Sequence, residues 1–293
     1  MRTASGPRST NATGRRTRAE MEAVREAVYD VAAADHPMTV RQVFYRLVSN
    51  GVIAKTEGEY KSTVVRLLAT MRRAGDIPYG WIADNTRWMR KPQSYNSLED
   101  ALRRTAETYR RALWADRDCY VEIWLEKDAL AGVLSTVTYE WDVPLMVTRG
   151  YPSLTYLHDA GETIAAHGRP TFLYYFGDHD PSGLDIPRKV EEELRGFAPD
   201  VELSFERVAV TPDQIDEWEL PTRPTKKTDT RARNFEGESV EVDAIPPALL
   251  RDLAWDCIAR HVDQRSLDLQ GVAEQSERAL LYEIAGTVTR GTT

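Results

Sequence analysis

The sequence predicts an α/β protein in which an N-terminal winged helix-turn-helix domain precedes a domain with a parallel sheet covered by helices on both faces. Two observations carry this prediction. Before residue 96, three stretches with helical spacing of apolar residues precede a short segment that contains proline and glycine. After Asp118, strand-like runs that are almost entirely apolar alternate with helix-like stretches, as in sheets buried on both faces.

The N-terminal part divides into an arm, a small domain and a connecting helix. Residues 1–18 are rich in Ser, Thr, Gly and Arg and contain no acid, which predicts a disordered basic arm. The winged-helix domain is expected over 19–95, and a helix near 97–115 fills the linker 96–118. Within the small domain, we expect helices over 19–34, from about Thr39, and over about 59–74, followed by a hairpin or wing over 77–89.

The second domain is expected over 119–286, including a C-terminal extension. The four predicted strands lie at 119–125, 144–148, 171–177 and 201–210, with a helix after each of the first three. Residues 221–238 are polar and predict an irregular loop. A further strand is expected at 239–244 and a helix from Pro246 to about His261, and the tail after Gly286 is expected to be loose.

Composition excludes several classes of protein. Of 293 residues, 42% are hydrophobic and 29% are charged, with both signs mixed, which argues against wholesale disorder. The chain has no run of 18 apolar residues and no apolar segment after its N-terminal arginines, so neither a membrane span nor a secretory signal is predicted. Two cysteines and five scattered histidines do not form a zinc motif. We therefore expect a cytoplasmic, reduced protein.

Charge is divided unevenly along the chain. Residues 1–118 hold 21 Lys and Arg against 14 Asp and Glu, or +7, whereas residues 119–293 hold 17 against 32, or −15, which together give the net charge of −8. The basic part predicts a polyanionic partner. The acidity of the second part is compatible with a solvated surface or with carboxylates clustered around a metal ion.

Three acids stand directly after predicted strands. Glu126 follows the run at 119–125, and Asp178 and Asp180 follow the run at 171–177. In an open parallel sheet, ligands bind outside the carboxyl ends of the strands at a switch point. A hard cation would relieve the repulsion between such acids, and Mg²⁺ favours a few carboxylates completed by water and phosphate oxygens. The alternative is that each acid is a helix cap or a turn residue.

The motifs around these acids resemble those of a known domain. Residues 125–129, 150–153 and 178–183 look like the three motifs of a Toprim domain, and more narrowly resemble the A subunit of topoisomerase VI and the related meiotic double-strand-break protein. The resemblance implies that Glu126, Asp178 and Asp180 bind Mg²⁺. Because primases, topoisomerases and nucleases share these acids, the motifs indicate metal chemistry more specifically than a reaction.

A tyrosine on the second predicted helix narrows the reaction. Thr39 and Gln42 form a capping box at the start of this helix. Tyr45 falls outside the apolar stripe and shares a helix face with Arg41. An exposed tyrosine beside an arginine is a candidate nucleophile, although the spacing alone is more typical of a tyrosine whose ring packs against a neighbouring helix.

The same segment strengthens the resemblance. Arg41 to Tyr45 resembles the Arg-acid-Ile-aromatic-Tyr segment of the topoisomerase VI A family, with Gln42 where that family usually has an acid. The resemblance implies that Tyr45 attacks a DNA phosphate with support from Arg41 and leaves a 3′ hydroxyl. It also implies a homodimer in which the tyrosine of one protomer works with the metal of the other.

Double-stranded DNA is the expected partner. The residues predicted to contact it are basic, and most lie on the outer side of the third helix: Lys61, Arg66, Arg72, Arg73 and, beside the first acid, Lys127.

The expected activity is Mg²⁺-dependent DNA strand breakage of the topoisomerase type, with rejoining left open. The chain has no P-loop pattern and resembles a reduced, A-subunit-only form of that family. The sequence does not show whether a GHKL-type ATPase is a further partner. Two alternatives remain: a Toprim nuclease that uses water as its nucleophile, and a non-catalytic DNA-binding protein.

Overall fold

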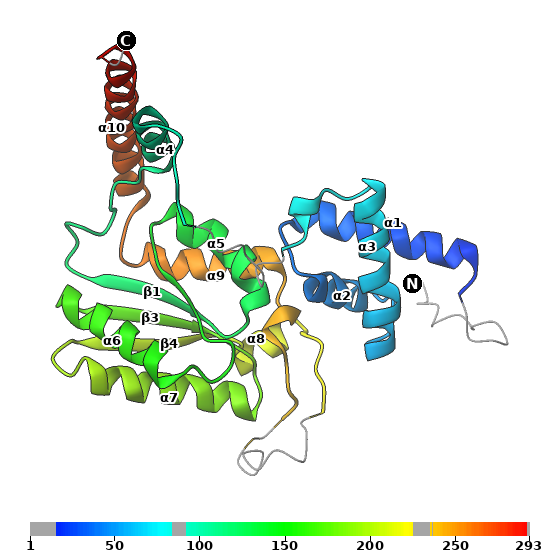
Figure 1. Ribbon diagram of the computed structural model, residues 1–293. Coiled ribbons are helices and arrows are strands. Elements are labelled where there is room, and N and C mark those ends of the chain that lie inside the picture. Colours follow the sequence, from blue (N-terminus) through cyan, green and yellow to red (C-terminus); the bar gives the residue numbers. More distant parts are fainter. Residues whose placement is uncertain (1–15, 84–91, 225–234, 236, 292–293) are drawn as a thin grey trace.

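The computed structural model describes residues 16–83, 92–224, 235 and 237–291. It consists of an N-terminal helical module, an α/β domain and a pair of helices that stands out from that domain (Figure 1). All described helices are too short or too polar to cross a lipid bilayer.

The helical module has the three helical stretches that the sequence predicts. They are α1 (Arg18–Asp35), α2 (Val40–Ser49) and a third stretch that begins as the π-helical segment η1 (Glu59–Val65) and continues as α3 (Arg66–Ala74), followed by the 3₁₀ turn η2 (Tyr79–Trp81). Thr17 and Thr39 cap α1 and α2 through capping boxes, which satisfy the free N–H groups of the first helical turn.

The ends of this module differ from expectation. Arg16 forms an ion pair with Glu59 at 2.7 Å, and α1 begins at Arg18, so the last residues of the predicted arm are structured, whereas its residues 1–15 lie outside the described part of the chain. The predicted wing over 77–89 begins as a 3₁₀ turn instead of a strand, and Ile82 forms an isolated bridge with Met38. The rest of the wing, residues 84–91, lies outside the described residues.

The α/β domain contains a four-stranded sheet in which all strands are parallel, in the order β2-β1-β3-β4. This confirms the α/β class and the predicted positions of the four strands. The strands are β1 (Tyr120–Leu125), β2 (Leu145–Val147), β3 (Thr171–Phe176) and β4 (Leu203–Ala209). The remaining elements are η3 (Asp128–Leu130), α5 (Ala131–Glu140), α6 (Leu154–His167), α7 (Pro181–Phe197), α8 (Pro212–Glu217), η5 (Val242–Ala244) and α9 (Pro247–Ala259).

Helices cover both faces of the sheet, as the apolar strands predict. Alternate residues of β1 point to opposite faces: Ile123 packs with α5 and α9, and Trp124 packs with α6 and α7. The first of these two cores is continuous with the core of the helical module, where Val43 and Leu47 belong to the same cluster. The module and the α/β domain are therefore packed against each other.

Two C-terminal expectations are wrong. The predicted strand over 239–244 forms only isolated bridges, Ser239 with Arg223 and Val240 with His179, before the turn η5. The tail is helical beyond Gly286, because α10 runs from Gln264 to Gly291. Its partner is α4 (Leu98–Thr108), the predicted linker helix, and the two lie side by side away from the sheet (Figure 1).

Candidate functional site at the carboxyl ends of the strands

The order of the strands creates a switch point between β1 and β3. From β1 the chain first moves outward to β2 and then returns to the other side of β1 to form β3. Ligands of open α/β sheets bind at the carboxyl ends of the two strands beside such a point. Glu126 follows β1 and Asp178 follows β3 after one glycine, and the backbone N–H of Asp178 donates to Glu126 Oε2 at 3.0 Å.

Two glycines allow this close approach. A Cβ atom on Gly177 would lie 2.6 Å from Glu126 Oε2, and one on Gly183 would lie 2.1 Å from the carbonyl oxygen of Asp178. At Gly183 the obstacle is backbone, so a side chain there would force the loop after β3 to move. At Gly177 a side chain would displace the carboxylate of Glu126.

The third predicted acid has a structural task. Asp180 is the N-cap of α7 and accepts a hydrogen bond from Gly183 N at 2.8 Å. Its other oxygen lies 3.6 Å from Arg223. The structure thus brings Glu126 and Asp178 together but gives Asp180 the capping role that the sequence left open. No three Asp, Glu, His or Cys side chains of the described residues are arranged around one point as ligands of an ion.

The paired acids are electrostatically strained. Burial, followed by the charge of Asp178, raises the pKa of Glu126 to about 7. Burial also raises the pKa of Asp178, against the opposing effect of the Lys127 ammonium group. A pair of carboxylates in this state gains from any cation that replaces its lost hydration.

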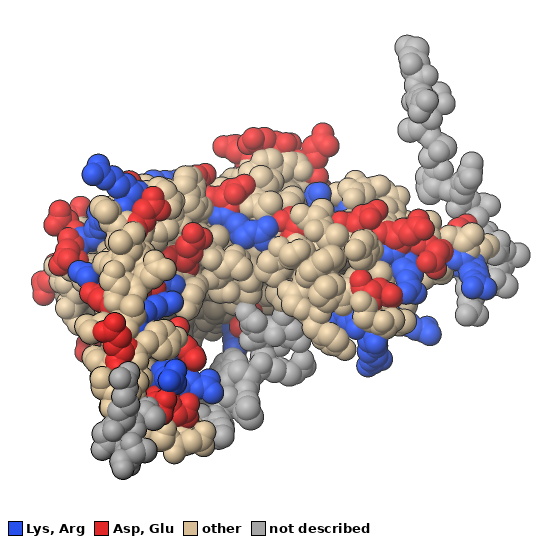
Figure 2. Space-filling model, turned by 90° about the horizontal axis from the view of Figure 1, so that it is seen from above, with Lys and Arg blue, Asp and Glu red and all other residues tan. Residues whose placement is uncertain are grey.

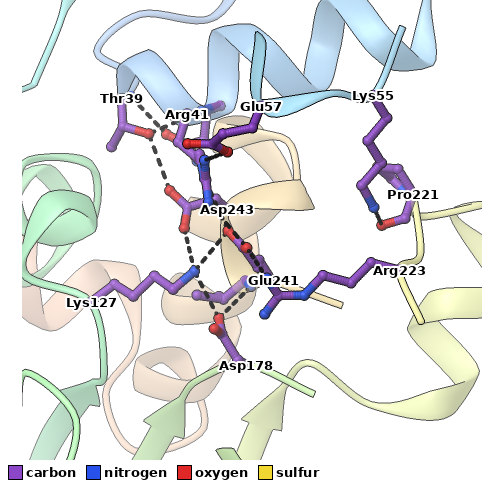
Figure 3. Close-up of polar contacts among 12 residues, drawn as sticks. Thr39, Arg41, Lys55, Glu57, Lys127, Asp178, Pro221, Arg223, Glu241 and Asp243 are labelled. Atoms are coloured by element: carbon purple, nitrogen blue, oxygen red, sulfur yellow. Dashed lines mark hydrogen bonds and ion pairs between the residues drawn. The ribbon is translucent and has the colours of Figure 1, made fainter. Parts of the chain in front are cut away.

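Lys127 supplies one such cation from within the chain. Its Nζ lies 2.7 Å from Asp243, 3.0 Å from Asp178 and 3.3 Å from Glu241 (Figure 3). These carboxylates outweigh burial and raise the pKa of Lys127. Three carboxylates of the chain therefore surround the ammonium group, and the contact of Lys127 with DNA stays a prediction.

The acid cluster also joins the two halves of the molecule. Arg41 on α2 donates to both carboxylate oxygens of Glu241, from Nε at 3.0 Å and from Nη2 at 3.2 Å. Burial alone would raise the pKa of Glu241, but Lys127, Arg41 and Arg223 lower it to about 2. Arg41 is thus held by a buried carboxylate of the α/β domain, as Figure 3 shows.

Further contacts continue this joint along α2 and beyond it. The hydroxyl group of Thr39 donates to Asp243 at 3.3 Å, and Gln42 Nε2 donates to the carbonyl oxygen of Ile245 at 3.4 Å. In the loop after α2, Lys55 Nζ donates to the carbonyl oxygen of Pro221 at 2.8 Å. The polar residues at the start of α2 are consequently directed at the segment 239–245.

Tyr45 lies inside this joint. Its side chain is only 4% exposed, and the Lys55 ammonium group lies 5.4 Å from its ring centroid. Burial and then the charge of Glu241 raise its pKa, although Arg41 and Lys127 act in the opposite direction. The prediction that Tyr45 falls outside the buried side of the helix is wrong, because the α/β domain covers the side of α2 that the helical module leaves open.

Three charged residues of the cluster lie outside the motifs that predict the site. Glu241 and Asp243 belong to the stretch that predicts a strand, and Arg223 belongs to the polar loop before it. Arg223 Nη1 forms an ion pair with Glu241 at 2.8 Å. A signal existed, since Glu241 and Asp243 alternate with valines and would share one face of an extended chain.

The basic residues predicted on the third helix have different surroundings. Lys61 is exposed and pairs with Glu57 one turn away, at 3.2 Å, and Arg66 and Arg73 are exposed. Arg72 is partly buried, with its guanidinium group 4.7 Å from the ring centroid of Tyr79. On the face seen in Figure 2, acidic and basic side chains lie intermixed over both halves of the molecule.

A groove runs along the exposed side of this helix. It has a volume of about 740 Å³ and is lined by hydroxyl groups, two arginines, the acid Glu59 and the apolar side chains of Met21 and Leu67. The lining residues include Arg16, Thr56, Ser62, Thr63, Arg66 and Thr70.

Comparison with known proteins does not assign the chain. No protein-family model matches it, and no curated protein is significantly similar to it. The geometry and charges of the site are therefore the basis for assigning a reaction.

Proposed function

We propose that this protein breaks phosphodiester bonds in DNA with the help of Mg²⁺ at the switch point of its sheet. The observation that carries the proposal is the pair formed by Glu126 and Asp178, whose carboxylates repel each other. The two residues are held together by a hydrogen bond from Asp178 N to Glu126 Oε2 at 3.0 Å. In this interpretation the helical module is a winged-helix domain and the α/β domain is a Toprim domain.

The residues present suit a magnesium ion. Backbone N–H groups orient one oxygen of each acid, because Glu126 Oε2 accepts from Asp178 N and Asp178 Oδ1 accepts from Val242 N at 2.8 Å. Mg²⁺ is usually held by one or two carboxylates, with water and phosphate oxygens as its other ligands. Glu126 and Asp178 would hold it, with Asp180 beside them. The ion would neutralise the charge that develops on the scissile phosphate.

The first candidate reaction is transesterification through Tyr45, as the resemblance to the topoisomerase VI A family implies. The phenolic oxygen of Tyr45 would form a bond to a DNA phosphorus, the bond to the 3′ oxygen would break, and the phenolic proton would end on the released 3′ hydroxyl. Arg41 would stabilise negative charge on the phosphate. Because Tyr45 is buried in this structure, the route requires α2 to separate from the segment 239–245.

The burial of Tyr45 favours a second candidate. A nuclease would use the same acids with water as its nucleophile, and Tyr45 would serve only to pack α2 against the α/β domain. In that case the joint between the two halves could remain closed throughout the reaction.

DNA would lie along the outer side of the third helix. Lys61, Arg66 and Arg73 are exposed there, and the adjacent groove offers hydroxyl groups and Arg66, whereas Arg16 in the same groove pairs with Glu59. Contacts of this kind bind phosphates without reading base sequence.

The proposal is tested by nicking of supercoiled plasmid with and without Mg²⁺. Glu126→Gln should abolish Mg²⁺-dependent nicking, whereas Glu206→Gln, which alters an exposed acid on β4 that pairs with Arg260, should leave it unchanged. Equal activity of wild type and Glu126→Gln, or no nicking by wild type while it binds DNA, would contradict the proposal; the second result would favour a non-catalytic DNA-binding protein.

Tyr45→Phe separates the two candidate reactions. Loss of nicking, together with a covalent protein–DNA adduct that forms with wild type and resists denaturant, supports transesterification. Retained nicking without an adduct supports the nuclease. Arg25→Gln serves as the matched control, because Arg25 pairs with Asp76 on the far side of the module.

A further inference from the structure

The α4–α10 pair carries an apolar stripe on its outer side. One side of α10 packs on α4 and includes the fully buried Ala285. Another side carries large apolar residues that are between 42% and 66% exposed: Leu269, Val272, Leu280 and Ile284. A helix with two apolar sides needs a partner for each of them.

The central row of this stripe, which also includes two small residues, has the spacing of a helix–helix interface. Leu269, Ala273, Ser276 and Leu280 follow one another at intervals of four, three and four residues, which places them on one narrow side of the helix. The two central residues are small and the two outer ones are large. The stripe therefore reads almost the same in both directions.

We propose that this stripe pairs antiparallel with the same stripe of a second copy of the chain. In a twofold interface each surface element meets its own counterpart. With the axis between Ala273 and Ser276, Leu269 of each copy packs against Leu280 of the other, and the small residues allow the helices to approach closely. The surface thus fits itself without a change of shape.

Charge supports the antiparallel arrangement. Arg265 and Glu283 are exposed and about five helical turns apart, so both lie on the same flank of the stripe. In an antiparallel pair this flank faces the same flank of the second copy. Arg265 of one copy then stands at nearly the level of Glu283 of the other, and the reciprocal pair forms at the opposite end.

A groove beside the stripe offers room for the projecting side chains. It has a volume of about 410 Å³. Its apolar lining consists of Leu269 and Ala273 together with Ala112, Leu113 and Ala115 from the segment before β1, and its polar lining of Arg111, Asp116, Arg117, Ser266 and Gln270. Leu280 of the second copy would lie at the mouth of this groove. Each copy therefore supplies both a projecting leucine and a receiving surface.

The stripe suits a protein partner better than a lipid surface. Helices that lie on membranes have a polar face rich in Lys and Arg, whereas the exposed charged residues beside this stripe include two acids, Asp268 and Glu283, and the single base Arg265. The inference concerns association alone and does not depend on the proposed reaction.

Analytical ultracentrifugation of the full chain over a concentration series tests the proposal. Wild type should form a dimer, and Leu280→Glu should raise its dissociation constant about 100-fold, because an unpaired carboxylate would be buried in the seam. Gln275→Glu adds the same charge to the same helix at an exposed position away from the stripe and should leave the dimer unchanged. Circular dichroism would verify that both variants are folded.

Charge reversal tests the direction of the pairing. Arg265→Glu and Glu283→Arg should each weaken the dimer about tenfold, and combining both changes in one chain should restore it. A monomeric wild type, a dimer that survives Leu280→Glu, or a double variant that is weaker than either single variant would overturn the proposal.

Discussion

Helices α2 and α3 belong to one small module and carry similar residues, yet they have opposite surroundings. Both present arginines on the side away from the core of the module. On α2, the guanidinium group of Arg41 meets the buried Glu241 of the α/β domain, whereas on α3 Arg66 and Arg73 face solvent. The difference comes from the segment 239–245, which covers α2 and leaves α3 open.

This contrast separates two tasks. The charged residues of α2 contribute to a joint, where a lost partner leaves a buried charge behind and the free energy of unfolding falls. The charged residues of α3 contribute little to stability and are available to phosphates. Substitutions on the two sides should therefore change different measured quantities.

The largest effect on stability is expected at the centre of the joint. Lys127→Met removes the only ammonium group within 3.3 Å of Asp178, Glu241 and Asp243 among the described residues, and should lower the free energy of unfolding by about 3 kcal/mol. Urea denaturation in the absence of divalent cations measures this change.

The control for this prediction is Lys61→Met. Among the residues that the structure describes, Lys61 pairs with the exposed Glu57 alone, so the cost should stay below about 0.5 kcal/mol. If both substitutions were equally mild, the carboxylates of the joint would not depend on Lys127 for their charge balance.

A smaller loss is expected from Arg41→Ala. The substitution leaves Glu241, which is 5% exposed, with Lys127 and Arg223 as its remaining cations, and should cost about 2 kcal/mol. Arg66→Ala on α3 should cost less than about 0.5 kcal/mol. Thermal unfolding of the two variants compares them directly, and a greater loss for Arg66→Ala would reverse the contrast between the two helices.

The contrast also shows how far sequence reasoning reaches. The meeting of Glu126 and Asp178 was predictable, because apolar runs identify parallel strands and parallel strands end at one edge. The burial of Tyr45 was not, because it depends on the segment 239–245, about 200 residues further along the chain. A helical stripe shows which side faces the helix's own module, but not whether another domain covers the remaining sides.

The same reasoning explains the errors near the C-terminus. Residues 239–244 alternate like a strand, but their backbone bonds the loop residues Arg223 and His179 instead of a sheet edge. The outward-facing apolar residues of α10 belong to a helix that packs on only one side within the chain. In both segments the structure therefore depends on contacts with distant parts of the chain, which the local sequence pattern does not reveal.

A pH profile distinguishes the two acids that frame the joint. The pKa of Glu126 is raised to about 7, so the folded state favours its neutral form, and stability present below about pH 4.5 is lost as pH rises toward 7. The pKa of Glu241 is lowered to about 2, so the stability it contributes is present above about pH 4.5 and is lost as pH falls toward 2.

Chemical denaturation between pH 5 and 8 with a chelator tests the first of these windows. Glu126→Gln, which stays neutral, should remove a decline in the free energy of unfolding of about 2.5 kcal/mol over this range. The matched variant Glu206→Gln alters an exposed acid and should retain that decline. A profile for Glu126→Gln that still matches wild type would show that Glu126 ionises normally.

The smallest expected effects concern the open side of the module, where DNA affinity is the measured quantity. Arg66→Ala and Arg73→Ala should each weaken binding several-fold and reduce the slope of log K against log salt by about 1, because each substitution would remove one of the proposed phosphate contacts. Arg103→Ala, on the exposed side of α4 where Arg103 pairs with Glu99, should leave both affinity and slope unchanged. Fluorescence anisotropy with duplex DNA at several salt concentrations measures both the affinity and the slope. An unchanged slope in both α3 variants would show that phosphates contact another surface.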